Sequence, residues 1–374
     1  MNNWPDDVDP TGRDLRELTD ELRAGHTVVR NRRGEWVLLG HAEVKAAAED
    51  PHSFSSAVAS HLQIPNGLDG AEHAEARAIL DRYFTPEALA PFEAPFSKIA
   101  ASLVASLPAE IDAVGDLGTV FAVRAQSAWL GWPRELEARL LAWMRDNHEA
   151  TRSGDRVRMA VVADEFDELI RQVLEPRRVM PVEDVTSALM AEGWKGRFFT
   201  DEELVSILRN WTGGDLGSIA LCVGVLASHL AADPALQAHL RSGGTDAELD
   251  AVVDEILRID DPFVTNRRKT TCPVHVGGVD IAEGQVVKLN WTSANRDESV
   301  FGADFDPAGH AADNLVYGIG PHVCPGRPLA TMELRIAVRA LLAGTSAIEP
   351  GAEEAEREVH PVGGFRRVPV RLGH

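Results

Sequence analysis

The residue with the clearest chemistry is Cys324, which stands alone in a loop rich in glycine and proline. The segment 317–330 reads Tyr-Gly-Ile-Gly-Pro-His-Val-Cys-Pro-Gly-Arg-Pro-Leu-Ala. The apolar and basic run that follows, 329–342, predicts a helix, whose free N–H groups and positive end stabilise a thiolate in front of it. A lone thiolate can be the axial ligand of haem iron, and glycines let the backbone pass close beneath a flat macrocycle. The alternative is a buried, unreactive thiol.

The composition is that of a globular protein with an acidic surface. The chain has 374 residues, of which 44% are apolar and 25% charged, and its net charge is −21. This acidity argues against nucleic acid as a partner, because nucleic-acid binding requires a basic surface. The scattered cysteines, the absence of a signal-peptide pattern and the lack of an uncharged apolar stretch of about 20 residues predict a cytoplasmic protein without a membrane anchor.

Helical periodicity dominates the chain, and strand-like alternation is confined to a few segments. The predicted helices are 14–24, 42–49, 71–83, 86–107, 134–149, 157–174, 182–191, 201–232, 234–240 and 246–260. Strands are predicted within 26–39, 274–289 and 367–372, and polar loops at 53–70 and 147–156. Because no strand–helix alternation and no linker are found, we expect a mainly α fold with many helices and small peripheral β-sheets, in a single domain over 1–374.

The cysteine loop resembles that of the cytochrome P450 family, Phe-x-x-Gly-x-His/Arg-x-Cys-x-Gly-x-x-Leu-Ala. Every fixed position matches except the first, where Tyr317 replaces phenylalanine. The resemblance extends over nearly the whole chain, and it implies a P450-like fold with Cys324 as the metal ligand of haem b, iron protoporphyrin IX.

The resemblance also implies which residues bind the two haem propionates. His73 and Arg77 are four residues apart on one helix face, and the Phe-Thr pair typical of the family follows them. Arg268 matches the next propionate-binding arginine, with Arg267 as the rival, and His322 matches a fourth cationic position. Without the resemblance, His73 and Arg77 would be interpreted as part of a solvated helix face.

The longest predicted helix contains a segment, 210–220, with three glycines. Glycine in a helix interior costs roughly 1 kcal/mol relative to alanine, which favours either close approach of a flat partner or a local distortion of the helix. In the family this segment carries an acid–alcohol pair that relays protons to the oxygen site.

The acid–alcohol pair is altered in this chain. A gap-free register counted from Asp233 places Ser218 at the alcohol position and Gly217 at the acid position. Asp215 and Ser218, three residues apart on one helix face, are then the catalytic candidates. A second register would put Asp215 at the acid position and Leu216 at the alcohol position. Asp215 could also bond only to nearby backbone.

Glu255 and Arg258 form a Glu-x-x-Arg pair on a predicted helix. Alone this is a weak signal, because surface pairs with this spacing are common. In the family the pair is buried behind the haem and holds the cysteine loop. The arginine that usually joins it is replaced here, with Asp304, Gly309 and His310 in its neighbourhood, so the third partner is left open.

The resemblance implies a haem-thiolate monooxygenase that inserts one atom of O2 into a small or medium, apolar organic substrate. Electrons would come from a separate ferredoxin and ferredoxin reductase, since no flavin or iron–sulfur segment is found, and the face around Arg327 and Arg335 is the candidate docking surface. Pocket residues are expected within 55–68, 211–218, 263–266 and 363–365.

Three alternatives stay open at this point. A peroxygenase that uses H2O2 directly is suggested by the displaced acid. A haem protein could instead sense or carry a ligand without turnover. A third possibility is a family member with an altered proton relay that performs coupling, desaturation or rearrangement.

Overall fold

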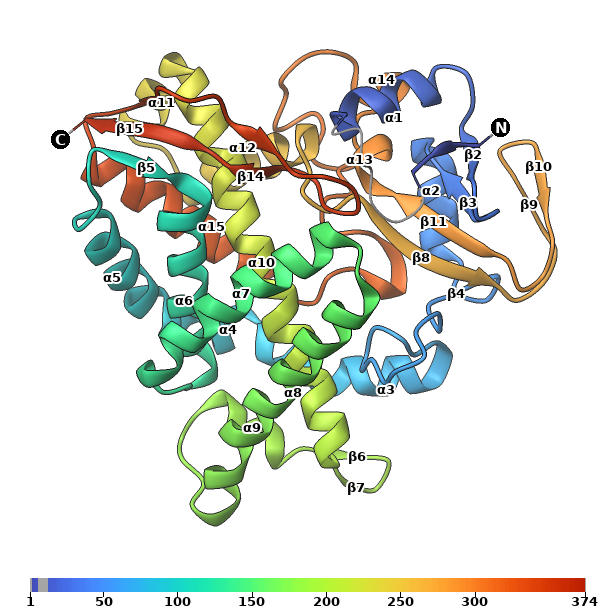
Figure 1. The fold of residues 1–374 in the computed structure, drawn as a ribbon, viewed down its shortest axis with the longest axis horizontal. Helices are drawn as coiled ribbons and strands as arrows, with labels where there is room; N and C mark the ends of the chain where they lie inside the picture. The colour runs from blue at the N-terminus through green and yellow to red at the C-terminus, as the bar shows by residue number, and fades with distance from the viewer. Residues whose placement is uncertain (1, 6–12, 374) are drawn as a thin grey trace.

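The computed structural model describes residues 2–5 and 13–373, which fold mostly into helices (Figure 1). The α-helices are α1 (Leu15–Arg23), α2 (His41–Glu49), α3 (Gly70–Leu80), α4 (Pro86–Leu89), α5 (Glu93–Val104), α6 (Val120–Leu130), α7 (Glu137–Ser153), α8 (Arg156–Val179), α9 (Val185–Met190), α10 (Asp201–Ala232), α11 (Pro234–Arg241), α12 (Asp246–Ile259), α13 (Trp291–Ala294), α14 (Glu298–Phe301) and α15 (Arg327–Gly344). The 3-10 and π segments are η1 (Asp81–Phe84), η2 (Ala90–Phe92), η3 (Ala113–Thr119), η4 (Arg134–Leu136) and η5 (Gly320–His322).

The strands form one six-stranded sheet and several smaller sheets. The larger sheet has the order β1 (Asn2–Trp4), β2 (Val28–Asn31), β3 (Trp36–Leu38), β11 (Val286–Asn290), β8 (Thr265–Thr270) and β4 (Phe54–Ser55). A three-stranded sheet has the order β12 (Ala347–Pro350), β15 (Pro369–Gly373) and β5 (Glu110–Asp112). Two-stranded pairs join β9 (Val274–Val276) to β10 (Val279–Ile281), β13 (Glu356–Arg357) to β14 (Phe365–Arg367), and β6 (Gly193–Trp194) to β7 (Arg197–Phe198). The expected mainly α fold with small peripheral sheets is confirmed.

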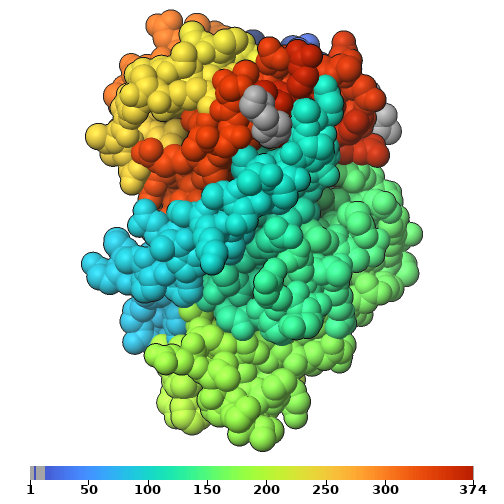
Figure 2. Space-filling model, turned by 90° about the vertical axis from the view of Figure 1, so that its left-hand side faces the viewer, coloured from blue at the N-terminus to red at the C-terminus, as the bar shows by residue number. Residues whose placement is uncertain are grey.

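The helices and the larger sheet occupy different regions of the molecule. Figure 1 shows β8 to β11 with α1 and α2 on the right, and the helices α5, α6 and α15 on the left. Figure 2 shows the C-terminal segment in red lying along the cyan segment that contains β5, in agreement with the antiparallel pairing of β15 with β5. The yellow-green segment between α8 and α10 forms the lower end in both views.

Helix α10 runs through the centre of the molecule and carries the glycine-rich segment (Figure 1). The helix begins at a capping box, in which the Thr200 hydroxyl accepts from the Glu203 N–H and the Glu203 carboxylate accepts from the Thr200 N–H. In the described part of the chain, α10 alone is long and apolar enough to cross a membrane, yet 67% of its most apolar window is buried inside the protein. Its hydropathy is therefore explained by its place in the core.

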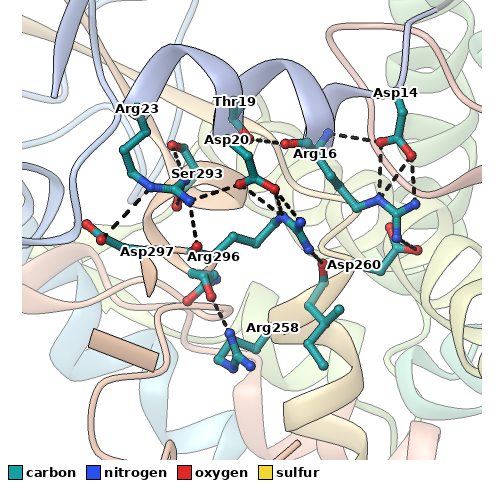
Figure 3. A network of polar contacts seen from close by, with 12 residues as sticks. Asp14, Arg16, Thr19, Asp20, Arg23, Arg258, Asp260, Ser293, Arg296 and Asp297 are labelled. Carbon is teal, nitrogen blue, oxygen red and sulfur yellow. Dashed lines mark hydrogen bonds and ion pairs between the residues drawn. The ribbon is translucent and has the colours of Figure 1, made fainter. Parts of the chain in front are cut away.

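Arginine–aspartate pairs tie α1 to α12 and to the turn after α13 (Figure 3). Arg16 pairs with Asp260, directly after α12, at 3.0 Å. Arg23 pairs with Asp20 at 2.9 Å and donates to the carbonyl of Arg296 at 2.6 Å, and Arg296 in turn pairs with Asp20. These contacts fix α1 against the segments that surround the Glu-x-x-Arg pair of α12.

Two local predictions are corrected by the structure, and one helical stretch was missed. The predicted loop 147–156 is largely helical, because α7 continues to Ser153 and α8 begins at Arg156, with only a two-residue turn between them. The predicted helix 86–107 is interrupted by η2. The helical stretch 113–130 was not predicted, because a π segment with two glycines precedes α6, and α6 is apolar on most of its surface.

Candidate functional site

Cys324 lies in the turn between η5 and α15. Its N–H donates to the carbonyl of Tyr317 at 2.9 Å, and the N–H of Arg327 donates to the Cys324 carbonyl at 3.4 Å. Gly320 has a φ of 77°, and a Cβ atom there would stand 2.6 Å from the carbonyl oxygen of Ala48 on α2. Glycine is therefore required for the loop to pack against α2 in this conformation.

The thiol of Cys324 is accessible, but it lies in a crowded environment. The residue is exposed, and burial nevertheless raises the pKa of its thiol. The N–H groups of Gly326 and Arg327 and the charge of Arg77 act in the opposite direction and lower that pKa. An accessible sulfur that is surrounded by N–H donors and a cation is suited to become an anionic ligand once a metal offsets the cost of burial.

The four residues predicted to bind the propionates lie close to one another beside the cysteine loop. They are His73 and Arg77 on α3, Arg268 on β8 and His322 at the end of η5. The rings of His73 and His322 are 4.1 Å apart, and Arg77 donates to the carbonyls of Pro321 at 3.1 Å and Val323 at 2.9 Å. Arg77 therefore also fixes the backbone that leads into Cys324.

The cluster combines two arginines with two imidazoles, and Asp69 is the carboxylate that faces it. The Nε2 atom of His322 lies 3.3 Å from Asp69 Oδ1. Burial, together with the charges of His73 and Arg268, lowers the pKa of His322 to about 4. Burial also lowers the pKa values of His73 and Arg268. A group with two carboxylates, such as a haem, would pair with Arg77 and Arg268 and would favour protonation of the two imidazoles, so the residues fit that cofactor.

Burial distinguishes Arg268 from Arg267 as the candidate for propionate binding. Arg268 is buried, and its guanidinium donates to the carbonyl of Arg267 at 3.0 Å. Arg267 is exposed on the opposite face of β8, because successive side chains of a strand alternate. Of the two arginines, Arg268 is the one whose charge lowers the pKa values of both His73 and His322.

Ser218 and Gly214 lie on the open side of α10. A Cβ atom added at Gly214 would have no neighbour within 4 Å. The Ser218 hydroxyl donates to the carbonyl of Gly214, one turn earlier. This contact occupies the Ser218 proton within the helix and leaves the oxygen lone pairs of Ser218 turned to the open side.

The other two glycines of this segment face α7 and α8. A Cβ atom at Gly213 would lie 3.8 Å from Phe166 and 3.9 Å from Trp143, whose rings are stacked at 3.9 Å. A Cβ atom at Gly217 would lie 3.5 Å from His148 Nε2. These are ordinary van der Waals distances, so an alanine would fit at either position and the packing alone does not require glycine there.

His148 is a site residue that the sequence did not reveal. It stands beside Gly217, the position at which the gap-free register expects the acid. Burial lowers the pKa of His148, Arg152 lowers it further, and Glu358 raises it. Arg152 and Glu358 are themselves paired at 2.5 Å. No spacing in the sequence connects α7 with the middle of α10, so the contact becomes visible only in the fold.

The Asp215 side chain lies close to Glu333 of α15, and burial raises the pKa values of both carboxyls. Asp215 and Ser218 were expected on one helix face, and each has a different partner in the structure. Glu333 was missed as well, because an isolated glutamate in a helical sequence gives no signal of burial.

The Glu255–Arg258 pair is buried, and its third partner is His310. Glu255 accepts from Arg258 Nε at 2.7 Å and Nη2 at 2.9 Å, and His310 Nδ1 lies 2.8 Å away. Burial raises the pKa of Glu255, but the hydrogen bonds from Arg258 and His310 outweigh burial and leave that pKa lowered. Arg258 also donates to the carbonyl of Asn295 at 2.5 Å (Figure 3). The pair therefore connects α12 with the segments on either side of the cysteine loop.

The arginines of the expected docking face are already paired within the chain. Arg327 pairs with Asp254 at 3.1 Å, and Arg335 pairs with Asp250 at 2.6 Å. A cleft of about 650 Å³ lies at the other end of α15 and includes His239 and Arg339 in its lining. That cleft is remote from Cys324, which precedes the first turn of α15.

Three of the expected pocket segments can be placed: the loop 55–68 is attached to α10, and 263–266 lies next to 363–365. The Asn210 amide donates to the carbonyl of Ile64 at 2.8 Å, which holds the loop 55–68 against α10. Phe263 forms a β-bridge with Val362, so the segments 263–266 and 363–365 are adjacent.

The comparisons with known proteins agree with this geometry. The family model for cytochrome P450 matches residues 248–344, which include α12 and the cysteine loop. Cytochrome P450(BM-1) of Priestia megaterium is 31% identical over 307 residues, with 78% of this chain and 73% of the relative covered. Cyclomarin C epoxidase CymV of Salinispora arenicola is 29% identical, with 90% of each chain covered. The solved structure of the open cytochrome P450 Eryk from S. erythraea is 26% identical and matches with a TM-score of 0.87 over 99% of this chain and 98% of that chain.

Fold and site together define a haem-thiolate enzyme. The chain belongs to the cytochrome P450 family. It is an oxidoreductase of the monooxygenase type that uses haem b, O2 and electrons from redox partners to oxidise organic substrates.

Proposed function

We propose that Cys324 ligates the haem iron and that His73, Arg77, Arg268 and His322 bind the haem propionates. The observation that carries this proposal is the convergence of two arginines and two imidazoles on the loop that carries the accessible thiol of Cys324. Haem bound through a thiolate supplies the activation of O2. The chain itself orients the haem through the cationic cluster and stabilises the thiolate through the N–H groups of Gly326 and Arg327.

Ser218 and Asp215 are the proposed proton-handling residues beside the oxygen site. Ser218 can accept a hydrogen bond on its open side while it donates to Gly214. Asp215 is a buried carboxyl with a pKa raised by burial to about 7, which suits proton exchange at neutral pH.

The proposed substrate is a small or medium, apolar organic molecule. The stacked pair Trp143 and Phe166 covers α10 beside Gly213 and offers an apolar aromatic surface. Leu62 and Ile64 come from the loop that is attached to α10 by Asn210. Apolar side chains of this kind favour a ligand that is recognised mainly by burial of its surface.

The proposed setting is cytoplasmic, with a separate ferredoxin and ferredoxin reductase as electron donors and with residues 1–374 acting as a single haem-thiolate domain. Because Arg327 and Arg335 are paired with Asp254 and Asp250, a ferredoxin would have to compete with these internal ion pairs. We expect such competition to make reduction strongly dependent on ionic strength.

A peroxygenase that uses H2O2 is the second candidate. It is favoured by Gly217 at the acid position, because the imidazole of His148 stands where the family carries a carboxylate. The two candidates are separated by turnover of one substrate with ferredoxin and reductase, or with H2O2 alone. Faster ferredoxin-driven turnover supports the monooxygenase, and faster peroxide-driven turnover supports the peroxygenase.

A further inference from the structure

A cluster of aromatic rings extends from the cysteine loop through the core to a half-buried tyrosine. Phe84 and the sulfur of Cys324 flank Gly326, because a Cβ atom at Gly326 would lie 3.7 Å from the Phe84 ring and 3.8 Å from the sulfur. The ring centroid of Phe84 is 5.2 Å from that of Trp129 on α6 and 5.3 Å from that of Trp211 on α10. A single phenylalanine ring therefore separates both indoles from the neighbourhood of the sulfur.

The two indoles lead on to Tyr83. The ring centroids of Trp129 and Trp211 are 5.2 Å apart, and that of Tyr83 is 5.3 Å from that of Trp211. Trp129 and Trp211 are buried, whereas Tyr83 is half-buried. These separations are typical of aromatic rings in direct contact, so the rings form a continuous path. Aromatic contacts of this kind also occur in ordinary protein cores, so the chemistry at Tyr83 and Trp211 is what distinguishes this cluster.

The hydroxyl of Tyr83 has a carboxylate as its hydrogen-bond acceptor. It donates to Glu192 Oε1 at 3.1 Å, and Glu192 Oε2 accepts from Arg82 at 2.7 Å. Burial raises the pKa of Tyr83, and the charge of Glu192 raises it further, so the phenol keeps its proton at neutral pH. A phenol that loses an electron becomes a strong acid, and Glu192 is placed to take its proton at that moment.

The indole N–H of Trp211 is buried and has no hydrogen-bond partner in the described part of the chain. An indole that loses an electron commonly loses this proton next. Because no acceptor is in contact, Trp211 keeps its proton and can be reduced again by a neighbouring ring. Tyr83 is such a neighbour, since it can give up an electron while its proton moves to Glu192.

We propose that Trp129, Trp211 and Tyr83 form an electron path that carries oxidising equivalents away from the haem-thiolate site to the half-buried Tyr83. The inference goes beyond the proposed function and rests on it, because bound haem supplies the oxidising equivalents when it reacts with O2 or peroxide. In the absence of substrate, the path removes these equivalents and so protects the haem and Cys324 from oxidation.

Each use of the path moves one electron and one proton. Tyr83 gives an electron through Trp211 and Trp129 toward the haem site, and its proton moves to Glu192. The O–H bond of Tyr83 is thereby broken, and a neutral tyrosyl radical is left. A small soluble thiol then returns a hydrogen atom to Tyr83, and Glu192 releases its proton to water. Two thiols oxidised in this way combine to a disulfide.

Electron paramagnetic resonance of the haem-loaded full chain detects this radical directly. The ferric protein is mixed with peracetic acid in the absence of substrate and is then frozen rapidly. The chain contains only two tyrosines, Tyr83 and Tyr317, so a tyrosyl signal can be assigned by substitution. Ring-deuterated tyrosine changes the hyperfine pattern of a tyrosyl radical and leaves that of a tryptophan radical unchanged.

The unmodified chain should give a tyrosyl signal that is lost in Tyr83→Phe and retained in Tyr317→Phe. Tyr317 is the matched control, because its buried hydroxyl has no hydrogen bond to a carboxylate among the described residues. A radical at Tyr317 would therefore have no carboxylate to take its proton.

Two further variants test the path and the proton acceptor. Trp211→Phe removes the indole next to Tyr83, and Glu192→Gln replaces the carboxylate that takes the proton, so both should weaken the tyrosyl signal. Trp36→Phe, which changes an indole on β3 that contacts Arg30, should leave the signal unchanged. The loss of Soret absorbance per equivalent of peracetic acid should increase in Tyr83→Phe and stay the same in Trp36→Phe.

The proposal is overturned if the unmodified chain gives no tyrosyl signal, or if the signal survives in Tyr83→Phe. If Tyr83→Phe does not fold, retention of the signal in Tyr317→Phe still assigns it to Tyr83, and its loss there overturns the proposal. The spectrum of the reduced protein with carbon monoxide separates the two levels. Thiolate-ligated haem without a tyrosyl signal contradicts the path alone, whereas the absence of thiolate-ligated haem contradicts the proposed function as well.

Discussion

Glu255 offers the sharpest test of what holds the cysteine loop in place. Replacement of Glu255 by alanine removes the acceptor of two hydrogen bonds from Arg258 and one contact with His310, and it leaves the Arg258 guanidinium buried. The exposed fractions of the two side chains in the ion pair are 1% for Glu255 and 5% for Arg258, so solvent cannot replace the lost partner.

The size of the effect follows from this burial. Breaking a buried ion pair by removing one partner costs about 3–5 kcal/mol, most of which is the uncompensated charge that stays behind. Arg258 keeps its bond to the carbonyl of Asn295, which places the expected loss in the free energy of unfolding at about 4 kcal/mol. Glu255→Gln, which retains one acceptor oxygen, should lie between the alanine variant and the unmodified protein.

Urea unfolding of the haem-loaded protein, followed by tryptophan fluorescence and by the Soret band, measures this loss. A control on the same helix is Glu248→Ala, because Glu248 is exposed and pairs with His239 at 2.9 Å. Removal of an exposed pair should change the free energy of unfolding by less than about 1 kcal/mol. Equal unfolding midpoints for Glu255→Ala and Glu248→Ala would refute the reasoning.

Three further predictions concern the cysteine loop and the cationic cluster. Arg268→Ala should accelerate haem transfer to apomyoglobin about 10- to 100-fold, as expected for the loss of a charged hydrogen bond, whereas the exposed Arg267→Ala should have little effect. Gly320→Ala should destabilise the protein by about 1–3 kcal/mol because of its positive φ and the carbonyl of Ala48, as measured by thermal unfolding, and an unchanged melting temperature would contradict the loop geometry. The folded-state pKa of His322 is lowered to about 4, so the neutral ring contributes to the free energy of unfolding above pH 6.5, and this contribution is lost as the pH falls through about 4. His322→Gln should therefore reduce the dependence of the free energy of unfolding on pH between these two values. Haem propionates favour the protonated ring, so bound haem should raise the folded-state pKa of His322 and narrow this pH range.

The cysteine loop and the residues beside it could be predicted from the sequence because the resemblance to the cytochrome P450 family rests on short motifs. Cys324 and His322 are separated by one residue, and His73 and Arg77 by one helical turn, so local geometry brings each pair together. The bounds of α10 could also be predicted from the sequence. Thr200 and Glu203 form a capping box at its start, and Asp233 follows its last residue.

The partners of Asp215, Gly217 and Glu255 could not be found in this way. Glu333, His148 and His310 reach them from other helices and loops, and neither periodicity nor composition specifies which side chain a helix presents to a distant neighbour. The helical continuation through 147–153 was missed for a related reason, because polar residues such as Asn147 and Thr151 gave the segment the composition of a loop.

The central claim is that Cys324 ligates haem iron as a thiolate. The most direct measurement is the absorption spectrum of the reduced protein with bound carbon monoxide, recorded for the unmodified chain and for Cys324→Ala. The account predicts a strongly red-shifted Soret band that is lost in the variant. A spectrum typical of neutral-histidine ligation in the unmodified protein, or a red-shifted band that persists in Cys324→Ala, would contradict it.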